Sequence, residues 1–223
     1  MSEERPKHSG RDAALFLREF LRTCRTTGAI LPSGRKLADA LSRSVRQAGE
    51  KPRHILEVGP GTGAVTEGIV AAMRPDDRLD LVELNERFVA RLRDRMRHDP
   101  KFRAVSPRTR IFHCDIEELP QEAKYDLIVS GLPLNNFSVE SVERILHALT
   151  GLLKPGGTLS FFEYIAIRRA LSLVSGARER MRLRGIGSVL RNFLQGREIR
   201  RDRVWLNVPP ACVHHLHDRA DFI

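Results

Sequence analysis

The chain has 223 residues, which suffice for one well-filled α/β domain and are too few for two ordinary ones. Its 41% hydrophobic and 30% charged residues are normal for a globular protein and argue against wholesale disorder. No run of about eighteen apolar residues occurs, and the start lacks an apolar stretch with a cleavage site, so we expect neither a membrane span nor a secretion signal. Three cysteines far apart in the sequence indicate reduced cytosolic thiols rather than a disulfide framework or a zinc site: Cys24, Cys114 and Cys212.

Positive charge is concentrated in two parts of the chain, whose net charge is +10. Residues 168–203 contain eleven arginines against three acidic residues, and residues 1–50 contain ten basic against six acidic residues. The centre, residues 51–167, is about neutral, with sixteen basic and seventeen acidic residues. Basic segments on a neutral core indicate that a polyanion or an anionic membrane surface is the partner.

Residues 1–33 form the first predicted unit, an amphipathic helix followed by a turn that would cover the cofactor. Over 9–25, Ser9 can cap the helix, and apolar side chains recur on one face with arginines on the other. The candidates for membrane contact on this helix are Phe16, Leu17, Phe20, Arg18 and Arg22. A turn over 27–33 follows, and then a second helix is predicted over 34–47.

Residues 34–223 predict one α/β domain in which strands alternate with helices. The strands are expected at 54–59, 79–84, 110–115, 125–133 and, after a turn at 154–157, at 158–164, with helices at 66–73, 86–97 and 139–153. Such alternation implies a parallel, doubly wound sheet whose site lies at the carboxyl ends of the strands. Residues 203–208 and 211–217 predict two further strands joined by a proline turn, which would give seven strands in all.

A glycine-rich turn follows the first predicted strand. Glu57 precedes Gly59, Gly61 and Gly63, and a helix begins directly afterwards. Glycines let the backbone approach a ligand closely, and the start of a helix supplies amide donors. These glycines alone do not choose the ligand, because the turn also satisfies the loose dinucleotide fingerprint and similar turns serve a structural purpose in many α/β folds.

Polar side chains at the ends of the next two strands favour one cofactor. Glu83 can accept hydrogen bonds from both hydroxyls of a ribose, and Asp115 can accept one from an adenine amine, although either alone is more often a helix-start or turn carboxylate. Together with the glycine turn and the C-terminal hairpin, they resemble the S-adenosylmethionine-dependent methyltransferases, whose last strand is antiparallel to the rest. The resemblance implies a Rossmann-like methyltransferase fold and the following cofactor-binding residues: Gly28, Ile30, Glu57, Gly59, Gly61, Gly63, Glu83, Leu84, Asp115, Ile116 and Ser130.

The segment 130–137, after the fourth strand, lies where the methyl group would be presented. It resembles the loop of amino-group methyltransferases in which a carbonyl and a side-chain amide hold the attacking nitrogen. An alkylammonium, with a free pKa of about 10, must lose a proton before it attacks, and an apolar pocket lowers that pKa. We expect the Leu132 carbonyl and Asn135 to position the amine, with Pro133 and Asn136 beside them. The alternative is that the loop is only a turn into the next helix.

Four segments in consistent order resemble the bacterial phospholipid N-methyltransferases: 27–33, 55–63, 130–137 and 207–211. The similarity extends from about residue 13 to 217. That family converts phosphatidylethanolamine to phosphatidylcholine in successive methylations, and relatives methylate the amine of ornithine lipid. The resemblance implies an N-terminal helix that binds anionic lipid, and therefore a cytoplasmic enzyme on the inner face of the cytoplasmic membrane. The departure from the family is a longer basic insert at about 168–203.

The basic insert predicts a second amphipathic helix. Leu183, Ile186 and Phe193 fall on one helical face, and arginines that include Arg184 and Arg191 flank it. Such a helix can lie in a membrane interface, which makes Phe193 and the two arginines candidates for lipid contact. Alternatively, its apolar face packs on the sheet and the arginines are solvated.

Three side chains are candidates for binding the substrate. Phe137 belongs to the loop after the fourth strand, and Glu163, at the fifth, is the best carboxylate to attract a cationic head group. Tyr164 and Trp205 could form an aromatic wall around a methylated ammonium, although core packing is the alternative for each.

Two other functions stay open at this point. A ribosomal-RNA adenine dimethylase has a related loop, but it needs an aromatic side chain to stack on the extruded base, and Leu134 stands at that position. A non-catalytic membrane-binding protein that keeps the fold is the other, and cofactor binding would distinguish it. His214, His215 and His217 do not predict a metal site, because His214 faces away from the other two on a strand. We expect neither a metal nor a nucleic acid among the partners.

Overall fold

The structure is a computed structural model, which describes residues 33–47, 49, 51–120, 125–165, 176–207 and 210–217. The predicted helix over 9–25, with its candidate membrane contacts, and the turn that contains Gly28 and Ile30 lie outside the described residues. They stay predictions.

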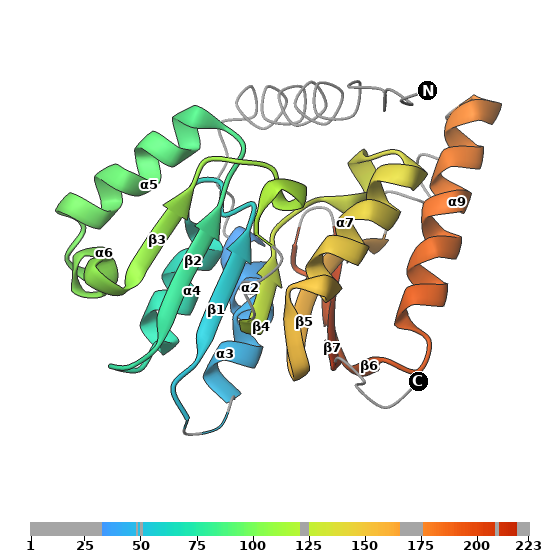
Figure 1. The fold of residues 1–223 in the computed structure, drawn as a ribbon. Coiled ribbons are helices and arrows are strands. Elements are labelled where there is room, and N and C mark those ends of the chain that lie inside the picture. Colours follow the sequence, from blue (N-terminus) through green and yellow to red (C-terminus); the bar gives the residue numbers. More distant parts are fainter. Residues whose placement is uncertain are drawn as a thin grey trace, which may run out of the picture.

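A seven-stranded sheet runs through the domain in the order β3-β2-β1-β4-β5-β7-β6 (Figure 1). The strands are β1 (His54–Val58), β2 (Arg78–Val82), β3 (Thr109–Phe112), β4 (Tyr125–Ser130), β5 (Leu153–Tyr164), β6 (Glu198–Val204) and β7 (Ala211–His217). The first five are parallel, whereas β7 is antiparallel to both of its neighbours, β5 and β6. The predicted Rossmann-like methyltransferase fold with a C-terminal antiparallel hairpin is confirmed. Since the strand order reverses between β1 and β4, a ligand is expected at the carboxyl ends of these strands.

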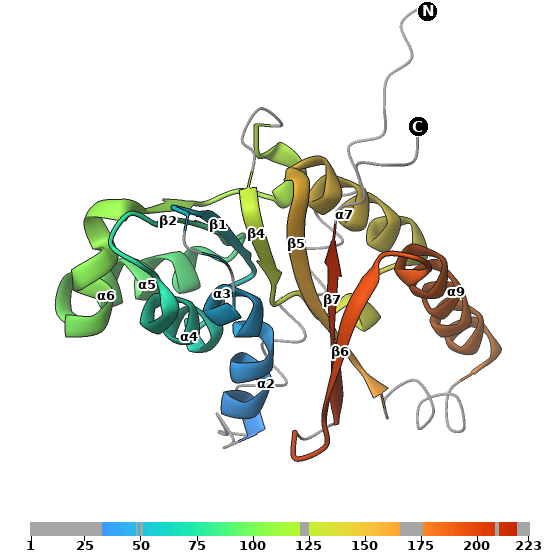
Figure 2. The same ribbon diagram turned by 90° about the horizontal axis from the view of Figure 1, so that it is seen from below.

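Helices cover both faces of the sheet, as Figure 2 shows. One face carries α2 (Ser33–Leu41), α3 (Arg43–Gln47), α4 (Ala64–Ala72), α5 (Glu86–His98) and α6 (Pro100–Val105). The other carries α7 (Val139–Gly151) and α9 (Ala177–Leu194), and short 3-10 turns lie at η1 (Ser106–Arg108), η2 (Ile116–Glu118) and η3 (Leu134–Asn136). Each face has its own apolar cluster, so the sheet is the shared wall of two cores.

Capping residues explain where several helices begin. The side chain of Asn85 accepts a hydrogen bond from the Arg87 amide at the start of α5, and Ser138 accepts from the Ser141 amide at the start of α7. These caps satisfy amide groups that have no partner inside the helix. Both helices therefore start directly after a strand-end loop, which keeps those loops at the carboxyl edge of the sheet.

Two helical predictions need correction. The helix expected over 34–47 is two helices, because the Ser42 hydroxyl bonds back to the Ala38 carbonyl where the chain changes direction. The helix α6 was not predicted at all. It starts at Pro100, is capped by Asp99, and buries Phe102 completely, so tertiary packing stabilises a segment too short to show a clear period.

Two strand boundaries also differ from prediction. β5 begins at Leu153 and contains the predicted turn as an irregularity, because Tyr125 pairs with Leu153 but Leu127 pairs with Thr158. β6 spans Glu198–Val204 rather than 203–208, since its pairing with β7 starts five residues earlier than its apolar residues suggested. A turn therefore begins at Trp205, directly after the end of β6.

Candidate active site

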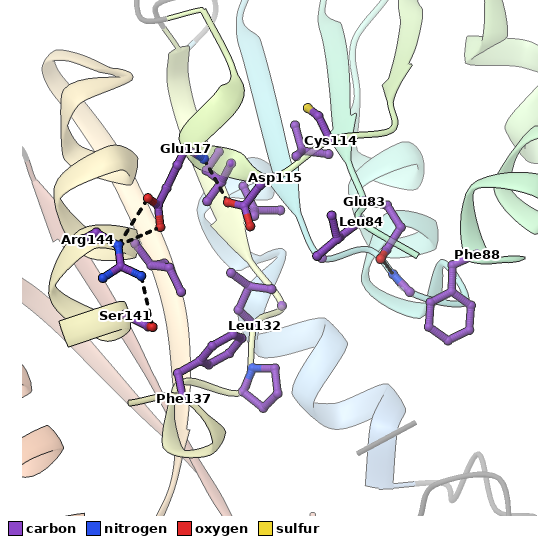
Figure 3. Close-up of a pocket in the computed structure, with 18 of the residues that line it drawn as sticks. Glu83, Leu84, Phe88, Cys114, Asp115, Glu117, Leu132, Phe137, Ser141 and Arg144 are labelled. Carbon is purple, nitrogen blue, oxygen red and sulfur yellow. Dashed lines mark hydrogen bonds and ion pairs between the residues drawn. The ribbon is translucent and has the colours of Figure 1, made fainter. Parts of the chain in front are cut away.

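A cavity of about 250 Å³ opens at the carboxyl ends of β1, β2 and β4, where the topology places a ligand. Figure 3 shows Glu83, Leu84 and Phe88 on one side of it and Leu132, Phe137 and Arg144 on the other, with Asp115 between them. The cavity brings together these predicted site residues: Gly59, Gly61, Glu83, Leu84, Asp115, Ile116, Leu132, Pro133 and Phe137. Residues as far apart in the sequence as Gly59 and Phe137 thus meet in one pocket.

The glycine turn forms the floor of this cavity. Gly59 has a φ of 70°, and a Cβ built there would lie 2.7 Å from Cδ2 of Leu132, so a side chain would be both strained and blocked. Gly61 has a φ of 56°, and its amide donates to Oε2 of Glu83 at 3.0 Å. The turn and the end of β2 are therefore locked together by one hydrogen bond.

Glu83 is a buried carboxylate at the cavity wall. Its Oε1 accepts from the amide of Asn85 at 2.8 Å, and its Oε2 accepts from Gly61. Although these bonds favour the charged form, burial outweighs them and raises the pKa of Glu83. Each oxygen keeps a second lone pair, so the side chain can accept hydrogen bonds from a diol.

Asp115 caps a 3-10 helix and also lies in the cavity wall. Its carboxylate accepts from the Glu117 amide at 3.0 Å and caps η2, while the Glu118 side chain accepts from the Asp115 amide. The same side chain lines the cavity. The cap fixes the orientation of the carboxylate, which is what a ligand-binding acceptor needs.

Glu57 lies beneath the cavity rather than in its wall. It is 0% exposed, and neither of its carboxyl oxygens has a hydrogen-bond partner among the described residues. Burial raises the pKa of Glu57 to about 8. A buried carboxyl without partners is costly unless a ligand supplies them, so Glu57 marks a place where no described residue supplies a donor.

The loop after β4 closes the cavity. Leu132 and Pro133 line it, and the chain then turns into η3, where Asn135 is buried. Nδ2 of Asn135 donates to the Tyr164 carbonyl at 3.4 Å, whereas its Oδ1 has no partner among the described residues. The loop is thus tied to β5 and holds one buried acceptor without a partner among the described residues, although Asn135 itself does not line the cavity.

The side chain of Arg182 fixes this loop from outside. Its Nη1 donates to the main-chain oxygen of Asn135 at 2.9 Å and also to that of Phe137. A bidentate pair with Glu179 holds the guanidinium in place. Sequence analysis missed Arg182 because only the fold brings α9 beside the loop.

Several predicted site residues do not reach the cavity. Gly63 has a φ of 85° and caps α4, and its carbonyl accepts from Arg95, so its role is in the backbone. Ser130 is buried at the end of β4, where its hydroxyl accepts from the Leu132 amide at 3.4 Å. Asn136 lies in η3 but does not line the pocket. For these residues the prediction of a direct cofactor or substrate contact is not supported by the geometry.

The two candidates at the end of β5 face other neighbours. Glu163 lies 3.5 Å from Nε2 of the buried His214, and Tyr164 packs edge-on against Phe162 with ring centroids 5.1 Å apart. Neither lines the cavity. Trp205, the other proposed wall residue, is 62% exposed in the hairpin turn and packs neither in the core nor at the pocket. Tyr164 and Trp205, which the sequence allowed to form an aromatic wall, therefore do not line the cavity.

The cavity also contains residues that sequence analysis missed. Phe88 comes from the first turn of α5, and Cys114 precedes Asp115. Arg144 lies in α7, where its Nε bonds to Glu117 at 3.2 Å and its Nη2 bonds to Ser141 at 3.2 Å. Cys114 could have been identified from its position after the end of a strand. Arg144 could not, because the spacing of residues within α7 does not indicate which of them face the cavity.

The apolar face of α9 packs on the protein. Leu183 and Ile186 are buried in the core, and the ring of Phe193 lies 6.2 Å from that of Phe161. The apolar face of α9 therefore packs on the protein, which leaves Leu183 and Ile186 unavailable to lipid, while a lipid contact of the half-buried Phe193 stays a prediction. Arg184 and Arg191 are exposed, and their contact with a membrane stays a prediction.

The strand histidines have protein partners on opposite faces of the sheet. His214 bonds to Glu198, and His215 bonds to Ser160 and Asp202. Within the described residues, no group of three or more His, Cys, Asp or Glu side chains is arranged to hold a metal ion.

Known proteins with similar sequences and structures identify the chemistry. Residues 55–157 match the family model of a methyltransferase domain. The chain therefore contains a methyltransferase domain, and its cofactor is S-adenosylmethionine. Its fold is similar to that of the 1,6-didemethyltoxoflavin N1-methyltransferase of Burkholderia thailandensis, with a TM-score of 0.62 and 16% identity over 97% of this chain and 93% of that one. That structure contains bound S-adenosylhomocysteine.

Two curated relatives differ in substrate. The chain is 28% identical over 153 residues to an ornithine lipid N-methyltransferase of Singulisphaera acidiphila, covering 67% of this methyltransferase and 77% of that one. It is 32% identical over 120 residues to the ribosomal RNA small subunit methyltransferase A of a Synechococcus species. That match covers 52% of this chain and only 40% of the relative. The first match agrees with the resemblance to aminolipid methyltransferases.

The residues of the cavity fit S-adenosylmethionine. Glu83 and Asp115 are acceptors for a ribose and an adenine amine, the glycine turn admits a close approach, and Glu57 lacks the donor that a ligand could supply. When bound, the cofactor supplies a methyl group carried on a sulfonium. What the protein adds is positioning and the exclusion of water from the acceptor side.

Proposed function

We propose that this methyltransferase transfers methyl groups to the amine of a membrane aminolipid head group, either phosphatidylethanolamine or ornithine lipid. The observation that carries the proposal is the loop after β4. It combines an apolar wall, Leu132 and Pro133, with a buried Asn135 whose Oδ1 has no partner among the described residues. An apolar wall beside one oriented acceptor suits an amine that must attack in its neutral form.

The apolar wall and the acceptor have separate roles. Leu132, Pro133 and Phe137 exclude water, and in such surroundings the ammonium form of the amine loses stability and its pKa falls. Asn135 and the carbonyl of Leu132 are acceptors that orient the N–H groups of the neutral amine. Catalysis then rests on in-line positioning rather than on a strong base. Each successive methylation consumes one S-adenosylmethionine, releases S-adenosylhomocysteine and one proton, and requires the product amine to rebind in its neutral form.

The relative from Singulisphaera supports the lipid class, because the chain covers 77% of it. The ribosomal RNA methyltransferase is the second candidate, favoured by 32% identity over the matched 120 residues. The loop after β4 argues against this second candidate. Leu134 is fully buried in η3, so no aromatic ring stands where an extruded base would stack.

The proposed lipid substrate places the enzyme at the inner face of the cytoplasmic membrane. No helix among the described residues is long and apolar enough to cross a bilayer. A net charge of +10 favours peripheral binding to anionic lipids, and the segment 9–25 and the exposed arginines of α9 are candidate contacts.

The test is a methyl-transfer assay with labelled S-adenosylmethionine and three acceptors: phosphatidylethanolamine, ornithine lipid and small-subunit ribosomal RNA. We expect label in one or both lipids and none in the RNA. Glu57→Ala should lose transfer to every acceptor because it removes a cofactor-site residue. Asn135→Ala should lose transfer while it still binds the cofactor. Label found only in RNA would overturn the lipid proposal.

A further inference from the structure

The hairpin turn after β6 exposes two large apolar side chains next to each other. Trp205 is 62% exposed and Leu206 is 69% exposed. The other exposed large apolar residues of the described chain, Met181 and Ile199, are isolated from one another in the sequence. Single exposed apolar residues need no explanation, but an adjacent tryptophan and leucine at the tip of a hairpin point to a binding surface.

This turn lies at the same edge of the sheet as the active site. Val204, the last residue of β6, pairs with Ala211, which in turn pairs with Tyr164 at the end of β5. The carbonyl of Tyr164 accepts from Asn135 in the loop that closes the cavity. The turn therefore extends from the carboxyl edge of the sheet, and Figure 2 shows the β6–β7 hairpin at the border of the sheet opposite α5 and α6.

The arginines of β6 differ in whether they have an acidic partner. Arg200 pairs with Asp202, and Arg201 pairs with Glu198, so the arginines farther from the turn are largely neutralised. Arg203 is exposed and forms no ion pair with any described residue. The cation without an acidic partner is thus the one closest to Trp205 and Leu206.

We propose that the 205–206 turn docks on a membrane that contains anionic lipids. Tryptophan favours the interface between head groups and acyl chains, a neighbouring leucine adds apolar contact, and an unpaired arginine can bind a lipid phosphate. A second copy of this chain is a poorer partner because it would present the same cation. The docked turn orients the carboxyl edge of the sheet, and with it the cavity, towards the lipid head groups.

This surface rests on the proposed function only in that an aminolipid substrate brings the enzyme to a membrane. The two ideas can fail separately. Transfer to an aminolipid dispersed in detergent tests the substrate without a bilayer, whereas vesicle binding tests the surface without catalysis.

Trp205 can serve as a fluorescent probe of vesicle binding, because it is the single tryptophan among the 223 residues. We expect its emission to shift to the blue when vesicles of phosphatidylcholine with phosphatidylglycerol are added, and to shift much less with phosphatidylcholine alone. Brominated acyl chains should quench it. Leu206→Ser and Arg203→Ser should each weaken vesicle binding about tenfold, since each removes one contact of the turn.

Ile199→Ser is the matched control, because Ile199 is 54% exposed on the same strand but at the opposite end from the turn. It should bind vesicles like the wild type. An unchanged Trp205 emission with anionic vesicles would overturn the proposal. Equal losses in Ile199→Ser and Leu206→Ser, or an emission shift with RNA but not with vesicles, would also overturn it.

Discussion

Carboxyl groups lie buried at both ends of the parallel strands, but the two ends treat them differently. In the middle of β2, Asp80 reaches towards the amino ends of the neighbouring strands, where it accepts hydrogen bonds from Arg110 at 2.8 Å and Tyr125 at 2.8 Å. Burial raises the pKa of Asp80, but hydrogen bonds from His54, Arg110 and Tyr125 outweigh burial and lower this pKa to about 2. At the carboxyl end, burial raises the pKa of Glu57 to about 8 and outweighs the neighbouring Thr66, which favours the charged form.

The difference separates structural from functional acids in one sheet. A buried carboxylate with a full set of partners contributes to folding, whereas one without partners costs stability that a ligand can return. Perturbed groups in a cavity mark functional sites when their shift comes from burial rather than from pairing. By that criterion, the end with Glu57 and Glu83 is the active end of the sheet.

The largest expected effect concerns the buried ion pair between Asp77 and Arg53. Asp77 is fully buried and pairs with Arg53 at 2.5 Å. Asp77→Ala would leave the guanidinium without its partner, which should lower the free energy of unfolding by about 3–5 kcal/mol. Urea denaturation measures this. Cofactor binding at temperatures where the variant is folded should stay normal, because Asp77 is remote from the cavity.

Asp94→Ala is the control for this change, since Asp94 forms an exposed pair with His98. Its effect on unfolding should be much smaller. If both variants lost the same stability, the distinction between buried and exposed pairs in this protein would be wrong.

The second prediction concerns the pH dependence of stability that the buried Glu57 should cause. A carboxyl whose pKa is higher in the folded protein than in the unfolded chain binds more protons when folded. The raised pKa of Glu57 therefore stabilises the folded state at low pH. This contribution to the free energy of unfolding is complete below about pH 4.5 and is lost as the pH rises through about 8. Glu57→Gln should therefore reduce the fall of unfolding free energy over that range, a change on the order of 1.4 kcal/mol for each pKa unit.

Thermal unfolding of the cofactor-free protein from pH 5 to pH 9 measures this slope. Glu57→Gln should also weaken cofactor binding in titration calorimetry. A variant with the wild-type pH slope would contradict the raised pKa, and one with wild-type cofactor affinity would contradict the functional role.

The smallest expected effect concerns the loop. Arg182→Ala removes the two hydrogen bonds to the carbonyls of Asn135 and Phe137, so the loop should lose its fixed position. We expect kcat to fall about tenfold, or ~1.4 kcal/mol of barrier, with little change in cofactor affinity. Arg180→Ala, an exposed neighbour on α9, is the matched control. A selective loss of cofactor affinity in Arg182→Ala would show that Arg182 acts elsewhere.

The local pattern of the sequence predicted most of the fold and the cofactor side of the site. Alternating strands and helices gave the parallel sheet, and strand ends placed Glu83 and Asp115 at the pocket, because parallel strands end at one edge. Short-range patterns did not reveal α6, whose helix depends on the burial of Phe102. They also predicted direct cofactor contact for Gly63 and Ser130, which do not line the cavity.

What the sequence by itself determined is the class of protein: the order of the elements, the glycine turn and the strand-end acids are local features, and they imply the cofactor. The tertiary structure alone decided how long-range neighbours meet. It packed the apolar face of α9 on the core, set Arg182 beside the loop, and left Trp205 in solvent. Periodicity reports which face of a helix is apolar, but only packing decides what covers that face.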